Sequence, residues 1–362
     1  MKSICFVCET PYQLLNTINY YCNRTELLDH TVDVYIGNVF FGFDRYVDAL
    51  KDEGLFDNIY TYSYAAEKKK AKLLKYIQVA MPCVFVNSLI KEPFKIKDKA
   101  YSHVFVSNLT PMGKAIIAAF PEAKVCYYDD GIGSYRSKIG ERGITKKHKT
   151  FYKLVGKDIS CFWPQVMYLN NPEMSNNLWR VELKQLPLLR EQSKTFIDML
   201  KRIFGGYPEV YNTSKVLYLS QPVERPTPEE NKKWAQIDRE VVSQLKKKGN
   251  FILRPHPREK LQEDPQVVYD TSRSLWELIC LDAITDDTIL IGNCSTAQFM
   301  PKFLFDKEPV LILTYRMYVK PEYWAYGDGL YNSLKEKYRD KEKLIAVESP
   351  EEMTEAIDKW QK

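Results

Sequence analysis

The sequence predicts an α/β protein made of two domains, each built on a parallel β-sheet. Three observations lead to this class. The chain has 362 residues, more than one ordinary core accommodates. Short apolar runs alternate with helical patterns in both halves, as in βαβ units. Three short polar motifs each follow an apolar run, and open α/β sheets bind ligands beyond the carboxyl ends of their strands. We therefore expect one site at these strand ends, between the two sheets.

The N-terminal half carries the first set of alternating elements. Thr10 is the expected N-cap of a helix whose first turn holds Pro11. Residues 165–213, rich in turn signals, are expected to form a connection with one helix at 191–204. The strands are expected at 3–8, 32–36, 58–62, 102–106 and 123–128, and the helices at 11–18, 44–53, 67–90 (interrupted near Pro82) and 112–119.

The C-terminal half repeats the alternation after a proposed hinge at 205–214. Its strands are expected at 215–220, 250–254, 266–269, 288–292 and 309–313, and its helices at 229–247, 273–283, 296–304 and 350–360. The predicted domains are therefore residues 1–205 and residues 214–362.

Composition limits the class of protein. Apolar residues make up 45% of the chain and charged residues 27%, which is typical of a soluble globular protein. The net charge of +5 does not by itself indicate a binding partner, but basic residues cluster at 68–75 and 138–149. We interpret these runs first as solvated surface; contact with an anionic membrane or glycan is the alternative. The runs lack interleaved aromatic residues, which disfavours nucleic-acid binding.

The cysteines and the chain's hydropathy favour a cytoplasmic location. Cys5 and Cys8 have C-x-x-C spacing, but within a strand residues three apart point to opposite faces, so we interpret them as structural. The eight scattered cysteines fit a reducing compartment. No secretory signal is visible and no apolar run reaches about 18 residues, so any contact with the inner membrane surface is expected to be peripheral.

The first polar motif, Asp129-Asp130-Gly131, follows the apolar run 123–128. A carboxylate within hydrogen-bond reach can remove a proton from a hydroxyl, and a neighbouring carboxylate can raise its pKa towards a useful range. Gly131 allows a tight turn and leaves space for a sugar. Asp130 is the first candidate for a general base and Asp129 the second, because the sequence does not show which one faces the site.

The second motif places His256 between Pro255 and Pro257 at a strand end. The two prolines restrict the backbone on both sides of the histidine. Histidine donates to phosphates and exchanges protons near neutral pH. Arg254 and Arg258, with fixed positive charge, suit an anionic ligand.

The third motif is Asn293-Cys294-Ser295-Thr296, between a buried-looking strand and a helix. Hydroxyls and backbone N–H groups at a helix N-terminus form an anion site. The plain alternative is an N-cap without a ligand.

The order of these motifs resembles the bacterial lipooligosaccharide and capsular polysaccharide sialyltransferases (glycosyltransferase family 52), which are related to the bacterial polysialyltransferases. Thr10-Pro11-Tyr12-Gln13 resembles the T-P-x-Q start of that family, and Ser295-Thr296 stands where Ser-Ser is common. The resemblance implies the GT-B fold, two Rossmann-like domains facing each other across a cleft. It also implies an acidic general base in D-D-G, a histidine that assists departure of the nucleotide, and hydroxyls that hold the donor phosphate.

Weaker signals fit the same family. Glu277, in Leu275-Trp276-Glu277-Leu278, resembles the glutamate of an F/W-E-x-L setting in related enzymes and is expected either to bind the donor ribose or to be a surface acid. Gln13 and Thr10 are expected either to contact a sugar or to form a plain helix start. The remaining donor-side candidates are Ser220, Gln221, Asn293, Arg254 and Pro257.

The predicted function is an inverting, metal-independent sialyltransferase that moves N-acetylneuraminic acid from CMP-Neu5Ac to a terminal galactose-type hydroxyl of a bacterial surface glycan. No metal-binding cluster, P-loop or dinucleotide motif is present in the sequence, so we expect no cofactor. A transferase for another CMP-activated ulosonic acid such as Kdo, a teichoic-type phosphotransferase, and a non-catalytic nucleotide- or glycan-binding assembly protein are the alternatives. A homodimer is left open.

Overall fold

The structure is a computed structural model that describes residues 2–40, 42–63, 77–90, 94–136, 146–221, 227–256, 259 and 264–361. The chain divides into two compact units, Met1–Phe204 and Gly205–Lys362, called here the N-terminal unit and the C-terminal unit. No helix within these described ranges is long and apolar enough to cross a membrane.

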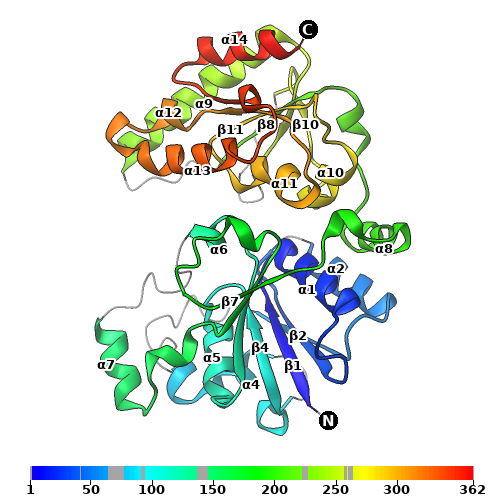
Figure 1. The fold of residues 1–362 in the computed structure, drawn as a ribbon, viewed down its shortest axis with the longest axis vertical. Helices are drawn as coiled ribbons and strands as arrows, with labels where there is room; N and C mark the ends of the chain where they lie inside the picture. The colour runs from blue at the N-terminus through cyan, green and yellow to red at the C-terminus, as the bar shows by residue number, and fades with distance from the viewer. Residues whose placement is uncertain are drawn as a thin grey trace. The chain divides into compact units, whose positions relative to one another are not determined.

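The N-terminal unit is built on a sheet whose seven described strands pair in parallel, in the order β3-β2-β1-β4-β5-β6-β7 (Figure 1). The chain fills one side of the sheet from β1 outward and then returns to place β4 on the other side of β1. This reversal is the topological switch point at which such sheets bind ligands. The strands are β1 (Ser3–Cys8), β2 (Thr31–Gly37), β3 (Asn58–Tyr62), β4 (Tyr101–Val106), β5 (Lys124–Tyr128), β6 (Val166–Leu169) and β7 (Glu182–Gln185).

Alternation along β1 sends its side chains to two helical layers. Cys5 and Val7 belong to the core cluster formed with α4 and α5. Phe6 points to the opposite face, where its ring meets that of Tyr20 in α1 at 5.5 Å. The helices of this unit are α1 (Pro11–Asn23), α2 (Phe43–Asp52), α4 (Pro82–Leu89), α5 (Pro111–Ala119), α6 (Gly133–Arg136), α7 (Lys146–Leu154) and α8 (Lys194–Phe204). The predicted helix across 67–76 lies outside the described residues.

The prediction that residues 165–213 form only a connection is wrong, because this segment contains β6 and β7. All four residues of β6 are buried, so its run Val-Met-Tyr-Leu has no alternation to mark it. The strand β7 lies at the sheet edge, and its residues are exposed or half-buried. A continuous apolar run of four residues is typical of a buried parallel strand, but it is short enough to pass for a loop.

The C-terminal unit contains six described strands in the order β10-β9-β8-β11-β12-β13, again paired in parallel. Its switch point lies between β8 and β11. The strands are β8 (Val216–Leu219), β9 (Ile252–Arg254), β10 (Val268–Tyr269), β11 (Ile289–Gly292), β12 (Val310–Leu313) and β13 (Leu344–Ala346). The sequence did not predict β13.

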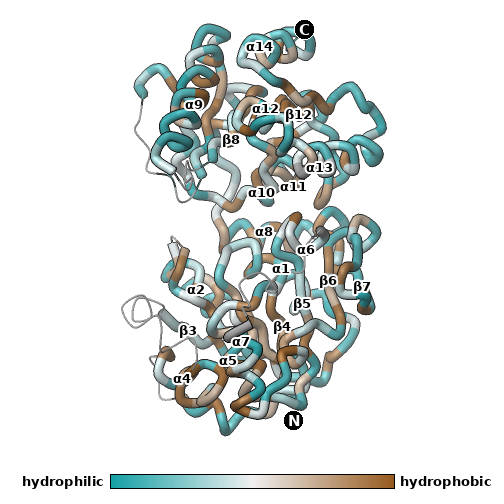
Figure 2. Tube along the Cα trace, turned by 90° about the vertical axis from the view of Figure 1, so that its left-hand side faces the viewer, coloured by the Kyte–Doolittle hydropathy of each residue, from teal (hydrophilic) through white to brown (hydrophobic). Residues whose placement is uncertain are grey.

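The helices of the C-terminal unit include the 21-residue α9, which begins with a capping box between Thr227 and Glu230. In Figure 2, α9 and α14 are largely teal, the colour of hydrophilic residues. The helices are α9 (Pro228–Lys248), α10 (Trp276–Asp282), α11 (Thr296–Phe305), α12 (Tyr315–Tyr318), α13 (Ala325–Lys335) and α14 (Pro350–Trp360). The sequence predicted neither α12 nor α13.

Gly292, the last residue of β11, lies in tight contact with its neighbours. A Cβ atom at this position would lie 3.1 Å from the carbonyl oxygen of Leu219 and 3.1 Å from the side chain of Gln298. The fully buried amide of Gln298 in turn donates to the carbonyl oxygens of Leu290 and Ile312. The Gln298 side chain thereby holds the start of α11 against β11 and β12.

Candidate functional site

The carboxylate of Asp129 is the centre of a buried polar network at the end of β5. Its exposed fraction is 0%. One oxygen accepts from the backbone N–H of Gly131 at 2.8 Å, and the other accepts from the Tyr135 hydroxyl and from both the backbone and side-chain nitrogens of Asn170. Burial raises the pKa of Asp129 in spite of these four donors. Asp129, a catalytic candidate in the sequence, is therefore a positioning residue with no surface for a substrate.

Asp130 is the acid of the pair that retains access to solvent. It is half-buried, and its backbone N–H donates to the Ser134 hydroxyl at 2.9 Å. Oδ1 accepts from the side-chain amide of Gln13 at 2.8 Å, whereas Oδ2 has no hydrogen-bond partner among the described residues. Burial raises the pKa of Asp130 to about 6, helped by the charges of Asp129 and Glu9 and opposed by the Gln13 hydrogen bond. A carboxylate with this pKa can act as a base near neutral pH.

The orientation of the Gln13 amide is fixed by its second contact. Its oxygen accepts from the backbone N–H of Glu9 at 2.6 Å, a group that can only donate, so its nitrogen must face Asp130. The Gln13 side chain is 3% exposed, and its backbone N–H donates to the Thr10 hydroxyl at 3.2 Å. Both residues, expected as sugar contacts, are therefore engaged in holding the start of α1 and Asp130.

The sequence missed Asn16 and Asn170, which complete the network. The Asn16 side chain donates to the backbone oxygen of Asp129 at 3.1 Å, and Asn170 donates to the Asn16 side-chain oxygen at 3.1 Å. Asn170 lies in the segment 165–213, whose turn signals predict a connection. The available signal was its place directly after a buried apolar run, the same pattern that marked Asp129.

Gly131 adopts a left-handed backbone conformation with φ of +89° and is buried. Such a φ favours glycine, and it turns the chain directly after Asp130. The tight turn that the sequence predicts at Gly131 fits this φ value.

In the C-terminal unit the candidates follow three adjacent strands. Ser220 follows β8, His256 follows β9 and Ser295 follows β11, and β9, β8 and β11 are neighbours in the sheet. The Ser220 hydroxyl donates to the carboxylate of Glu259, which also accepts from the backbone N–H of His256 at 3.1 Å. Parallel strands bring their carboxyl ends to one edge, so these residues share that edge of the sheet.

The guanidinium of Arg254 is committed to an internal ion pair. It binds the fully buried Asp270, and it also donates to the carbonyl oxygen of Ser274 at 2.7 Å and to the Tyr211 hydroxyl at 3.2 Å. Burial opposes ionisation of Asp270, but Arg254 and hydrogen bonds from Ser272 and Tyr211 outweigh it and lower the pKa of Asp270. The expectation that Arg254 binds the donor is not supported by this geometry; we interpret it as the anchor of the strand that carries His256.

Ser295 is the N-cap of α11. Its hydroxyl accepts from the backbone N–H of Ala297 at 3.3 Å, and its own N–H donates to the side chain of Gln298 at 3.2 Å. The hydroxyl hydrogen of Ser295 is still available to donate, because capping uses only the oxygen. Ser295 and Thr296 are both half-buried at the first turn of this ten-residue helix.

The remaining donor-side candidates differ in accessibility. Glu277, in the first turn of α10, is 8% exposed, so it is not the surface acid of the alternative interpretation. Asn293 and Gln221 are half-buried at the ends of β11 and β8. Pro257 lies outside the described residues, as does Arg258.

Within the described ranges, no three His, Cys, Asp or Glu side chains lie close enough together to bind a metal ion. Metal independence stays a prediction.

Comparisons with known proteins identify the fold. No protein-family model matches the chain, and no curated protein is significantly similar to it in sequence. Among solved structures, the chain is similar to the kitacinnamycin glycosyltransferase, with a TM-score of 0.57, 10% identity, and coverage of 99% of this chain and 90% of the other. The spinosyn rhamnosyltransferase SpnG complexed with thymidine diphosphate matches at a TM-score of 0.49 and 9% identity, covering 100% of this chain and 92% of the other. The predicted fold class, two Rossmann-like α/β domains of the GT-B type, is confirmed.

The first prediction separates the two aspartates by stability. Asp129→Asn should destabilise the protein by about 2–4 kcal/mol, because an amide nitrogen would face donors that are then left buried and unsatisfied. Asp130→Asn should leave stability at pH 7 unchanged or raise it, because burial raises the folded-state pKa of Asp130 and so disfavours its charged form. Urea unfolding of both variants measures the difference, and equal losses would contradict the assignment.

The second prediction concerns Gln13. In Gln13→Leu the donor to Asp130 is lost, so the Asp130 anion is less stabilised and its pKa should rise by about one unit above 6. Carboxyl ¹³C NMR titration measures the shift. Gln236→Leu is the matched control, because Gln236 makes the same amide-to-carboxylate contact with Glu240 on an exposed face. An unchanged Asp130 pKa in Gln13→Leu would contradict the positioning role of Gln13.

The third prediction tests the structural role of Arg254. Arg254→Met should destabilise the protein by about 3–5 kcal/mol, because Asp270 would be left buried and unpaired. Lys359→Met, which breaks the exposed pair with Glu342, should cost less than about 1 kcal/mol. Urea unfolding compares them. A stable Arg254→Met protein that had lost only affinity for an anionic nucleotide would restore the ligand-binding interpretation.

Proposed function

We propose that this protein is an inverting glycosyltransferase that moves N-acetylneuraminic acid from CMP-Neu5Ac to a hydroxyl of a terminal galactose-type acceptor in a surface glycan. The observation that carries the proposal is the state of Asp130, a half-buried carboxylate with a pKa of about 6 and one unengaged oxygen. The GT-B fold supports the coarser statement of glycosyl transfer. The sialic acid donor is supported by the order of the D-D-G, His-Pro and Ser-Thr motifs.

The proposed reaction begins at Asp130. Its unengaged Oδ2 accepts the proton of the acceptor hydroxyl while Gln13 holds Oδ1 in place. The acceptor oxygen attacks the anomeric carbon of the sialic acid from the side opposite the phosphate. The bond between that carbon and the phosphate oxygen breaks, its electron pair leaves with CMP, and the configuration inverts. Each proton and electron pair is accounted for without a metal ion.

Charge that builds on the departing phosphate needs donors that are already in place. His256 follows β9, and Ser295 and Thr296 follow β11; both strands pair with β8 in the sheet of the C-terminal unit. Ser295 and Thr296 begin α11, whose N-terminus favours an anion. The capping box and the buried Gln298 amide hold this helix start in one position. Preorganised donors of this kind cost no rearrangement during the reaction and commonly supply the largest share of catalysis.

The fourth prediction is the activity itself and its dependence on Asp130 and His256. The wild-type protein should transfer from CMP-Neu5Ac to a galactose-terminated acceptor in EDTA. Asp130→Asn and His256→Ala should each lower kcat by about 10²–10⁴-fold, the usual contribution of a positioned proton-transfer group. Between pH 5 and 8, kcat/KM should rise with pH to a plateau with a midpoint near 6, because the base works only when ionised.

The controls distinguish the alternatives. Lys359→Met, far from the site residues in sequence and engaged in an exposed ion pair with Glu342 and a contact with the Trp360 ring, should retain full activity. Transfer from CMP-Kdo but not from CMP-Neu5Ac would replace the donor and leave the reaction class intact. Binding of CMP without turnover of either donor would instead support a nucleotide-binding protein. Loss of transfer in EDTA that Mg²⁺ restores would contradict metal independence.

A further inference from the structure

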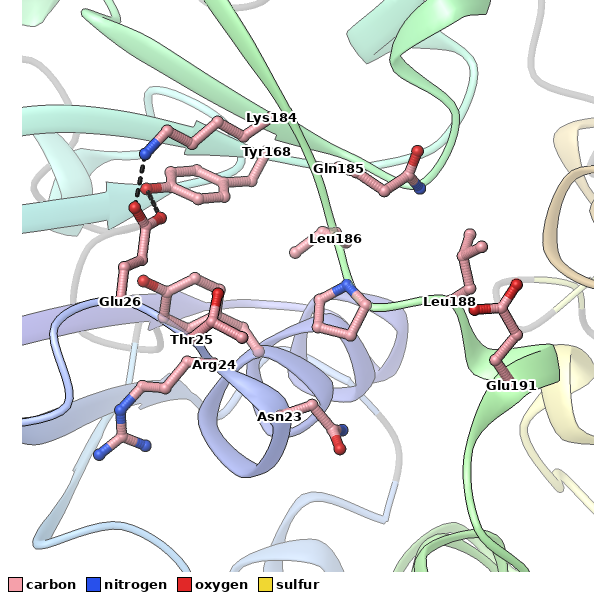
Figure 3. A pocket seen from close by; sticks show the side chains of 12 residues that line it. Asn23, Arg24, Thr25, Glu26, Tyr168, Lys184, Gln185, Leu186, Leu188 and Glu191 are labelled. Atoms are coloured by element: carbon pink, nitrogen blue, oxygen red, sulfur yellow. Dashed lines mark hydrogen bonds and ion pairs between the residues drawn. The ribbon is translucent and has the colours of Figure 1, made fainter.

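The N-terminal unit contains a pocket of about 420 Å³ away from the Asp130 carboxylate, a volume within the range of small-molecule sites (Figure 3). It lies over the outer strands β6 and β7, beside the C-terminal part of α1. Twelve residues line it, drawn from α1, the loop that follows α1, the two strands and the segment that follows β7.

One wall of the pocket is a fixed polar cluster. Lys184 and Glu26 form an ion pair at 2.5 Å, and the Tyr168 hydroxyl donates to the same carboxylate. Burial opposes ionisation of Glu26, but hydrogen bonds from Lys184 and Tyr168 outweigh it and lower the pKa of Glu26. Figure 3 shows the three side chains meeting at one end of the pocket, with Leu186 and Leu188 further along it.

Tyr20, whose hydroxyl is buried, is one of the residues that line the same pocket. Tyr20 is 3% exposed, and its hydroxyl has no hydrogen-bond partner in the part of the chain that the structure describes. A buried polar atom without a partner is costly, and such atoms commonly acquire a ligand or a water. Tyr20 cannot turn away, because its ring packs against Phe6, Phe105 and Tyr168.

The charges that line the pocket cancel. Arg24 and Lys184 carry positive charge, and Glu26 and Glu191 carry negative charge. A site for a phosphate or a carboxylate would show an excess of positive charge. Balanced charge, together with amide and hydroxyl groups beside leucine and proline side chains, suits an uncharged polyhydroxylated ligand.

A row of amide side chains on α1 extends from Asp130 to the pocket, and three of its four members, Gln13, Asn16 and Asn19, are buried. Gln13, Asn16, Asn19 and Asn23 are spaced three or four residues apart, so they share one helix face. Gln13 donates to Asp130, Asn19 donates to the Pro187 carbonyl oxygen at 2.6 Å, and Asn23 lines the pocket. Ten residues of helix separate the ends of this row, which is about 15 Å at 1.5 Å per residue.

We propose that this pocket is an acceptor subsite that binds an uncharged sugar of the acceptor, several units away from the hydroxyl that is modified. The subsite rests on the proposed function, because the acceptor is defined by the transfer reaction. It selects acceptors by length and by lack of charge, at a place that Asp129, Asp130 and Gly131 do not line.

Binding without donor tests the subsite independently of catalysis. Lacto-N-tetraose, a neutral tetrasaccharide that ends in galactose, should bind the wild-type protein at least tenfold more tightly than methyl β-galactoside in isothermal calorimetry. Its affinity should be unchanged between 50 and 500 mM NaCl, because no net charge is neutralised. Tighter, salt-sensitive binding of the anionic 3′-sialyllactose would overturn the uncharged class.

Three variants locate the binding. Tyr20→Phe removes only the unsatisfied hydroxyl, so it should weaken lacto-N-tetraose about three- to tenfold without loss of stability. Thr25→Trp places a large ring at the exposed rim of the pocket and should abolish the advantage of the tetrasaccharide over methyl β-galactoside. Asp29→Trp, in the same loop but outside the pocket, should change neither affinity.

The outcomes separate the subsite from the reaction. Transfer activity with equal tetrasaccharide affinity in wild type, Tyr20→Phe and Thr25→Trp would overturn the subsite and leave the proposed function standing. Tetrasaccharide binding that both variants weaken, in a protein with no transfer from any CMP-sugar, would support the pocket as a saccharide site and refute the transferase.

Discussion

The carboxylate of Asp129 is the constraint on which the arrangement of the N-terminal unit depends. Four hydrogen bonds connect it to the turn after β5, to Tyr135 and to the residue that follows β6. Its backbone oxygen is bound by α1 through Asn16. Because one buried acid fixes two strands and a helix, the next residue in the chain, Asp130, is presented in a single direction with a single set of neighbours.

In the C-terminal unit a buried charged group also fixes a strand end, but through an ion pair and not through hydrogen bonds to a lone carboxylate. The buried pair of Arg254 and Asp270 anchors the end of β9, and His256 follows two residues later. In both units a charged residue with a structural role precedes the residue proposed to act on substrate, by one position at Asp130 and by two at His256. Polar residues at a strand end therefore have two roles. The buried ones, such as Asp129, hold the backbone in place, and the more accessible ones, such as Asp130, can contact a substrate.

Hydrophobic patterns in the sequence predicted β1 to β5 and β8 to β12 but missed β6, β7 and β13. The residues of β6 are all buried and those of β7 are exposed or half-buried, so neither strand shows the alternation that marks a half-buried strand. The motifs identified Asp130, yet only the hydrogen bonds show that Asp129 and Arg254 are enclosed. Asn16 and Asn170 belong to no motif, because their importance arises from contacts across 113 and 41 residues of chain.

Gly292 sets a limit on how this protein can diversify. The absence of a side chain there lets the end of β11 approach the Leu219 carbonyl oxygen and the Gln298 amide closely. A residue with a side chain at position 292 would force one of these neighbours to move, so a change at these strand ends would require several residues to change together. New ligand preferences are accordingly expected to arise more readily in surrounding loops and in outlying pockets than at the strand ends that precede Ser220 and Ser295.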